Sequence, residues 1–145
     1  MSLYDTDFFQ WTQEQAALLR SGRLEALELL HIADELEAMG SRERRELVHR
    51  LEELLKHLLK WRYQAGLRSP SWEISITKQR DAIEDLLSDN PSLRHRLDPV
   101  TVKAYNRAQR YAAKETGLPV SHFPEICPFS VEQTLDSDYW PEAAG

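Results

Sequence analysis

The sequence predicts an all-α protein, a four-helix-bundle-like up-down bundle with an additional helix and a proline-rich C-terminal strap. Three observations support this. Apolar residues recur at spacings of three and four over long stretches, which is the period of a helix with one buried face. The alternation typical of strands is absent from the sequence. The 145 residues, of which 41% are hydrophobic and 29% charged, suit one globular domain, residues 1–145, with a sizeable core.

The first expected helix covers about residues 4–20. Its opening is aromatic, because Tyr4, Phe8 and Trp11 recur at i, i+4 and i+7. Aromatic side chains at this spacing are typical of a core or an interface, and only rarely of a ligand site.

The next two helices, at about residues 24–39 and 41–63, are expected to form an antiparallel pair. Gly40 can take the left-handed conformation that ends one helix, and Ser41 is a good N-cap for the next. So short a connection favours a helical hairpin. The second helix carries the leucine ridge of the expected core, formed by Leu47, Leu51, Leu54 and Leu58 and continued by Trp61.

A further helix is expected at about residues 72–88. Its inward positions include Ile76 and Ile83, but Arg80 falls on the same face. An unpaired buried charge is very costly, so this guanidinium has to find a carboxylate or several carbonyl groups. Glu28 and Glu35 are the expected carboxylate partners.

A short helix is expected after Pro91, and a longer one at about residues 99–116 with small side chains every four residues, ended by Gly117. Residues 118–145 are expected to be an irregular strap across the bundle, since prolines at 119, 124, 128 and 141 interrupt regular structure. Within the strap, Ser130 and Gln133 can cap a single helical turn.

Several short motifs, in this order and spacing, resemble one family. They are Tyr4-Asp5-x-Asp7-Phe8 with Trp11, Met39-Gly40, His57-Leu58-Leu59-Lys60-Trp61, Ser71-Trp72, Gln79-Arg80, Pro91-Ser92-Leu93, Phe123-Pro124-x-x-Cys127-Pro128 and Trp140-Pro141. Together they span nearly the whole chain and are similar to the bacterial family catalogued as "domain of unknown function 29". The resemblance implies an all-α bundle, and it implies no activity and no catalytic residues.

Composition and net charge disfavour several classes of function. A formal net charge of -6 disfavours general nucleic-acid binding, because an anionic surface repels phosphate. The single cysteine, Cys127, cannot form an internal disulfide. No apolar run approaches the roughly 20 residues that span a bilayer, and the opening residues lack the pattern of a signal peptide. We therefore expect a cytoplasmic protein that does not enter membranes.

Two Glu-x-x-His motifs raise the possibility of a di-metal bundle, because this spacing puts two ligands on one helix face. The pairs are Glu28 with His31 and Glu46 with His49. Glu46 and His49 lie away from the leucine ridge, whereas metal ligands of such bundles point inward. Solvated surface is the favoured interpretation of both pairs, so we expect no metal and no cofactor.

Looser patterns allow other enzymatic interpretations. The Arg-x4-6-His spacing of some all-α ribonucleases is met by Arg44 with His49 and by Arg50 with His57, although charged helices often contain it by chance. Cys127 could be a nucleophile, but a buried structural thiol is the more common case.

The leading functional hypothesis is a non-enzymatic helical bundle that acts through protein contacts, either as a homo-oligomer or bound to another bacterial protein. The chain carries more large aromatic residues than a small core has to bury. The alternative is a metal-dependent or Arg/His-based hydrolase or nuclease with a polar site between helices. Its candidate residues are His57, Arg80 and Glu35, which this alternative places in one pocket.

Overall fold

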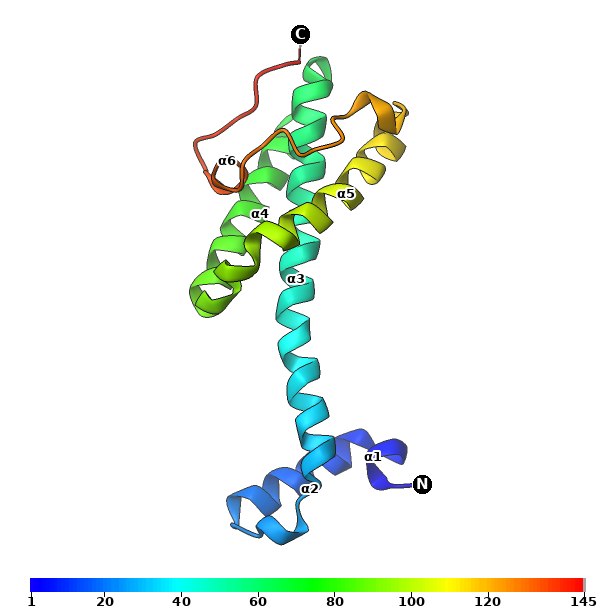
Figure 1. The fold of residues 1–145 in the computed structure, drawn as a ribbon, viewed down its shortest axis with the longest axis vertical. Coiled ribbons are helices and arrows are strands. Elements are labelled where there is room, and N and C mark those ends of the chain that lie inside the picture. Colours follow the sequence, from blue (N-terminus) through cyan, green and yellow to red (C-terminus); the bar gives the residue numbers. More distant parts are fainter. Residues whose placement is uncertain (145) are drawn as a thin grey trace. The chain divides into compact units, whose positions relative to one another are not determined.

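The computed structural model describes residues 1–144, and all regular structure within them is helical (Figure 1). The predicted all-α bundle is confirmed. The chain divides into two compact units. We call them the N-terminal unit (Met1–Arg42) and the C-terminal unit (Glu43–Gly145). A single folding domain stays a prediction.

The N-terminal unit contains two short helices and the beginning of a long one. The elements are α1 (Leu3–Thr6), α2 (Phe8–Arg20), the 3-10 helix η1 (Leu24–Ala26) and the first part of α3 (Leu29–Tyr63). The expected helix at residues 4–20 is divided at Asp7, where the backbone leaves the helical region (φ -148°, ψ 84°). The Asp7 carboxylate accepts the backbone N–H of Gln10 at 3.0 Å and so caps α2.

The predicted turn at Gly40 is wrong, because α3 is one unbroken helix from Leu29 to Tyr63. Among the described residues, only Gly22 and Gly117 have positive φ, so Gly40 keeps a helical backbone. A glycine inside a helix costs only about 1 kcal/mol relative to alanine. The residues around it are mostly glutamate, arginine, alanine and leucine, which favour helix strongly enough to offset that cost. The antiparallel pair expected at residues 24–39 and 41–63 is therefore replaced by a single helix.

The C-terminal unit contains the remaining elements. They are the second part of α3, the 3-10 helix η2 (Ala65–Leu67), α4 (Pro70–Asp89), the 3-10 helix η3 (Pro91–Arg96), α5 (Leu97–Thr116), the 3-10 helix η4 (Val120–His122) and α6 (Val131–Leu135). The helices predicted at residues 72–88 and 99–116 correspond to α4 and α5. Gly117 ends α5 in the left-handed conformation (φ 75°), as predicted.

Buried side chains of α3, α4 and α5 form one hydrophobic core. Figure 1 shows these three helices in the C-terminal unit. The four leucines of the ridge have no exposed surface, which confirms the predicted buried face of α3. Ile76 and Ile83 of α4 and Ala104 and Ala108 of α5 pack against them, all with 0% exposure. The alanines let α5 approach closely because they have no bulk beyond Cβ.

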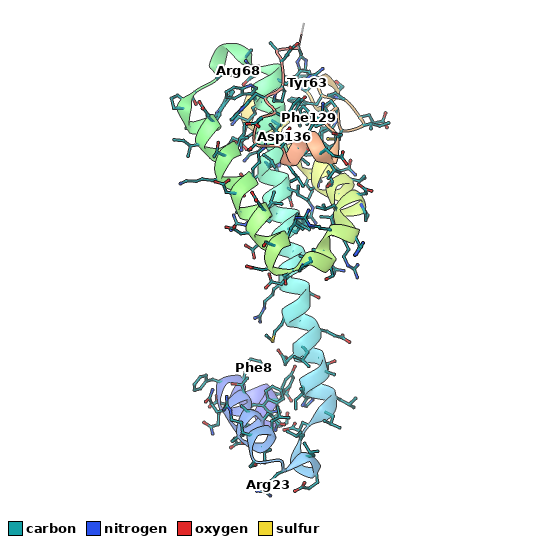
Figure 2. All side chains as sticks on the ribbon, turned by 90° about the vertical axis from the view of Figure 1, so that its left-hand side faces the viewer. Phe8, Arg23, Tyr63, Arg68, Phe129 and Asp136 are labelled. Carbon is teal, nitrogen blue, oxygen red and sulfur yellow. The ribbon has the colours of Figure 1, made fainter. Side chains whose placement is uncertain are left out.

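The strap covers one end of this core, and its described residues are 118–144. Ser130 and Gln133 form the predicted capping box at the start of α6, which contacts both α4 and α5. Arg68 fastens the end of the strap, donating from Nη2 to the Pro141 carbonyl at 3.1 Å and from Nε to the Trp61 carbonyl at 2.8 Å. In Figure 2 the labelled Arg68, Tyr63 and Phe129 lie at this end of the unit.

Candidate functional site

Glu28 is the centre of a polar network inside the N-terminal unit. Its Oε2 accepts hydrogen bonds from Trp11 Nε1 and from Gln15 Nε2, each at 3.0 Å. The Gln15 Oε1 in turn accepts the backbone N–H of Glu28 at 3.0 Å. Trp11 and Gln15 are the only buried residues of this unit, at 3% and 6% exposure. Charge-assisted hydrogen bonds therefore connect α2 to the start of α3.

Tyr4 adds a second layer to the same network. Its ring stacks on His31 with centroids 4.1 Å apart and an interplanar angle of 12°. Its hydroxyl donates to the Glu35 carboxylate, and this bond is the main cause that raises the pKa of Tyr4 to about 12. His31 Nδ1 lies 3.0 Å from Glu28 Oε1. One face of the first turns of α3 is thus covered by α1 and α2.

The rest of the N-terminal unit is unusually apolar where it meets solvent. Nine of the fifteen exposed large hydrophobic residues among the described positions lie in this unit, which is less than a third of the chain. They are Met1, Phe8, Phe9, Leu19, Leu24, Leu29, Leu30, Leu36 and Met39. Figure 2 labels Phe8 on this unit. Leu29 and Leu30, 66% and 83% exposed, line a shallow hollow of about 280 Å³ together with Glu28 and His31.

Opposite faces of α3 explain this distribution. At about 100° per residue, Glu28, His31 and Glu35 share the side that α1 and α2 cover. Leu29, Ala33, Leu36 and Gly40 recur at i, i+4, i+7 and i+11 on another side, and all four are exposed. We call these four residues the apolar stripe. No residue of its own unit buries the apolar stripe.

Net charge is distributed as unevenly as apolar exposure. Residues 1–42 contain eight acidic and three basic residues, a formal charge of -5, whereas residues 43–145 contain sixteen and fifteen, a formal charge of -1. Glu37 lies beside the apolar stripe, and Asp34 lies further round the same side of α3, next to Leu30; both acids are exposed. The unit with the exposed apolar side chains is therefore also the strongly anionic one.

The two Glu-x-x-His pairs differ in the structure. Glu28 and His31 do come together, but both Glu28 oxygens already have partners. Glu46 instead pairs with Arg50 at 3.0 Å, and His49 is exposed. Over residues 1–144 there is no group of three His, Cys, Asp or Glu side chains that could hold a metal ion.

Arg80 is buried on α4, at 4% exposure, as its place on the apolar face predicts. Its Nε donates to the Thr134 carbonyl at 2.9 Å and its Nη2 to the Gln133 carbonyl at 3.2 Å. These carbonyls belong to the last turn of α6, so the charge also caps that helix. Burial lowers the pKa of Arg80. Of the two kinds of partner expected, the structure gives it backbone carbonyls. The expectation of Glu28 or Glu35 as its partner is wrong, because these carboxylates accept hydrogen bonds from α1 and α2.

His57 and Glu35, the other candidate catalytic residues, have local partners. His57 is half-buried, and its Nδ1 lies 2.8 Å from the carbonyl oxygen of Glu53, to which it donates. Burial lowers the pKa of His57, and the neighbouring charges of Lys56 and Lys60 act in the same direction. Glu35 accepts from Tyr4 in the N-terminal unit.

The remaining enzymatic candidates are also engaged or weakly reactive. Arg50 binds Glu46 and donates from Nη1 to Gln79 Oε1 at 3.3 Å. Cys127 is half-buried, and burial raises the pKa of its thiol, which leaves little of the nucleophilic thiolate near neutral pH.

Two surface features were not predicted from the sequence. One is the apolar stripe, because the expected hairpin placed residues 24–39 inside the bundle. The other is a cleft of about 500 Å³ in the C-terminal unit between α3 and α4, whose lining contains four acidic side chains, Glu43, Glu46, Asp85 and Asp89, and the basic Arg50. The spacing of these acids along each helix could have indicated it once the two helices were known to be neighbours.

The chain matches the family model described as "Domain of unknown function DUF29" over residues 3–140. No curated protein and no solved structure matches it. Within the described residues, the helices lack the combination of length and apolar character that crossing a bilayer requires.

Proposed function

The chain belongs to the family of the domain of unknown function DUF29, and we propose that it acts by binding another protein through its N-terminal unit. The observation that supports the proposal is the exposure of Leu29, Leu30 and Leu36 on α3 beside a unit interior of only Trp11 and Gln15. About 40 residues rarely bury enough apolar surface to be stable alone. Apolar surface left exposed to this extent is typical of a protein interface.

The C-terminal unit serves in this proposal as the stable scaffold. Its core contains the leucine ridge and the buried faces of α4 and α5, so it needs no partner to exclude water from them. A cytoplasmic site of action is part of the same proposal, and the lone Cys127 fits a reducing compartment.

The enzymatic alternative, a metal-dependent or Arg/His-based hydrolase or nuclease, has no comparable support. Arg80 and His57 both donate to backbone carbonyl groups, and the Glu28 carboxylate is occupied by Trp11 and Gln15. We therefore propose protein binding alone.

Site-specific crosslinking tests the proposal. A photo-reactive amino acid replaces Leu30 in the full chain, and a matched control carries it at Ile126; the two native side chains are 83% and 82% exposed. After irradiation in the native host, we expect a discrete adduct from position 30 and none from position 126. The partner is then identified by mass spectrometry and purified.

Binding measurements with the purified partner complete the test. We expect Leu30→Gln to weaken the complex about tenfold, as loss of a buried apolar contact does, and Ile126→Gln to leave it unchanged. Equal effects of the two substitutions, or the same adducts from both positions, would contradict the proposal.

A further inference from the structure

The side chains on the exposed face of α3 indicate what kind of partner can pack against it. Leu29 and Leu36 offer apolar side chains seven residues apart, and between and beyond them Ala33 and Gly40 offer almost no bulk. A Cβ built at Gly40 would have no atom within 4 Å, so this end of the apolar stripe is open. Large side chains separated by small ones are what an opposing helix needs in order to pack closely.

The length of the apolar stripe also favours a helical partner. The apolar stripe covers residues 29–40, which is about 18 Å at the rise of an α-helix. This distance accommodates roughly three turns of a second helix lying along α3. An amphipathic helix placed in this way contacts its target through residues at i, i+3, i+4 and i+7.

The negative charge of the N-terminal unit indicates the charge of the partner helix. Glu37 is exposed beside the apolar stripe, Asp34 is exposed further round the same side of α3, and the whole unit carries a formal charge of -5. A second copy of this chain would bring the same negative charge to the interface, and an anionic membrane would likewise repel it. Lysine or arginine side chains on the flanks of the partner would instead be attracted and would increase the association rate.

We infer that the apolar stripe of α3 binds a basic amphipathic helix of another protein, with its apolar side chains on Leu29 and Leu36 and its basic side chains toward Asp34 and Glu37. The inference rests on the proposed function and specifies the chemistry of the partner.

Model peptides test the inference on the purified full chain. The probe is a helical peptide of about 18 residues with leucine on one face and lysine beside it, long enough to cover the apolar stripe. One control peptide replaces every lysine with glutamate, and another scrambles the order so that the apolar face is lost. Binding is measured by titration calorimetry at about 0.05 M and about 0.5 M salt, where screening differs strongly.

We expect only the basic amphipathic peptide to bind, and its affinity to fall about tenfold or more at the higher salt concentration. Leu36→Gln should weaken binding about tenfold, as should Asp34→Asn combined with Glu37→Gln. The matched charge control, Glu125→Gln combined with Glu132→Gln, removes two exposed acidic groups from the C-terminal unit and should have no effect. Circular dichroism checks that each variant retains its helix content.

Other results would overturn the inference. Equal binding of the scrambled peptide, or equal weakening by the charge control, would mean general attraction to an acidic protein. A dimer of the full chain that Leu36→Gln converts to a monomer would mean that a second copy occupies the apolar stripe. Binding to vesicles of phosphatidylcholine and phosphatidylglycerol, lost on the same substitution, would mean that a membrane does. If the peptides fail but the adduct from position 30 persists, only the partner chemistry is wrong; if both fail, the proposed function fails as well.

Discussion

The two units of this protein use the same kind of helix pattern to opposite effect. In the C-terminal unit, Leu51 and Leu54 of α3 have 0% exposure, whereas Leu30 and Leu36 in the N-terminal part of the same helix are 83% and 62% exposed. Both parts have apolar residues at spacings of three and four. Periodicity therefore identifies the face of a helix that can be buried, but the covering surface can belong to a different molecule.

The interactions inside the two units also differ in kind. Apolar packing dominates the C-terminal unit, where α3, α4 and α5 share one core. The interior of the N-terminal unit is mostly a hydrogen-bond network around Glu28 and the Tyr4–Glu35 pair. We expect the first unit to respond mainly to changes in side-chain volume, and the second to changes in charge and hydrogen bonding.

The largest expected difference comes from matched leucine truncations. Leu54→Ala should lower the free energy of unfolding by about 2–5 kcal/mol, because it leaves a cavity in the core. Leu30→Ala should change it by less than about 0.5 kcal/mol, since that side chain is already in water. Urea unfolding followed by circular dichroism measures both. A small effect of Leu54→Ala would show that the ridge is not the core of the C-terminal unit.

The next effect concerns the buried charge of the C-terminal unit. Arg80→Met should destabilise the protein by about 1–3 kcal/mol, because the Gln133 and Thr134 carbonyls lose their donors. Arg94→Met is the matched control, since exposed Arg94 lines the same hollow of about 200 Å³. Thermal unfolding of both variants compares them. If the two variants have the same melting temperature as the native chain, the contact between α4 and α6 contributes little.

A smaller and local effect is expected in the N-terminal unit. Glu28→Gln weakens the charge-assisted bonds to Trp11 and Gln15 and should lower the free energy of opening of α2 by about 1 kcal/mol. Hydrogen exchange of residues 8–20 should become faster while exchange in residues 51–59 stays the same. Glu37→Gln, which alters an exposed acid on the same helix, is the control. An equal acceleration of exchange in residues 51–59 would contradict the separation of the two units.

The smallest effect is a pH dependence. Because burial lowers the pKa of His57 from its ordinary 6.5, the unfolded chain binds a proton at a pH where the folded chain does not. The contribution to stability is complete above about pH 6.5 and is lost as the pH falls from there to the folded pKa. Urea titrations at pH 7.5 and about pH 5 should show a smaller loss of stability for His57→Gln than for the native chain. Identical losses would mean that His57 does not contribute.

Much of the C-terminal unit could be predicted from the sequence. The ridge of α3, the capping box of Ser130 and Gln133, and the end of α5 at Gly117 all follow from local signals, and the structure confirms each. Local signals predict this unit well because the residue pattern of each helix and the packing around it favour the same structure.

The predicted turn at Gly40 failed for an energetic reason. Gly40 and Ser41 have the residue types of a helix end, but the helix-forming residues on both sides outweigh the roughly 1 kcal/mol that one glycine costs. Residues 40–46 contain no large apolar side chain, and this gap, which precedes the ridge at Leu47, was the available sign of a change in environment along α3.

The partners of the candidate site residues were less predictable. The need of Arg80 for a carboxylate or several carbonyl groups could be inferred from its position, but the choice of the α6 carbonyls could not, because backbone acceptors leave no mark on side-chain patterns. Likewise, the link from Glu28 to Trp11 and Gln15 depends on how α2 meets α3, which periodicity does not determine.

Native-state hydrogen exchange of the full chain tests the contrast between the two units most directly. If the N-terminal unit lacks a core of its own, the amides of residues 8–20 should exchange through a local opening at a free energy well below that of global unfolding. The amides of residues 51–59 should exchange only on global unfolding. Equal protection of the two segments, with the same dependence on denaturant, would contradict the account.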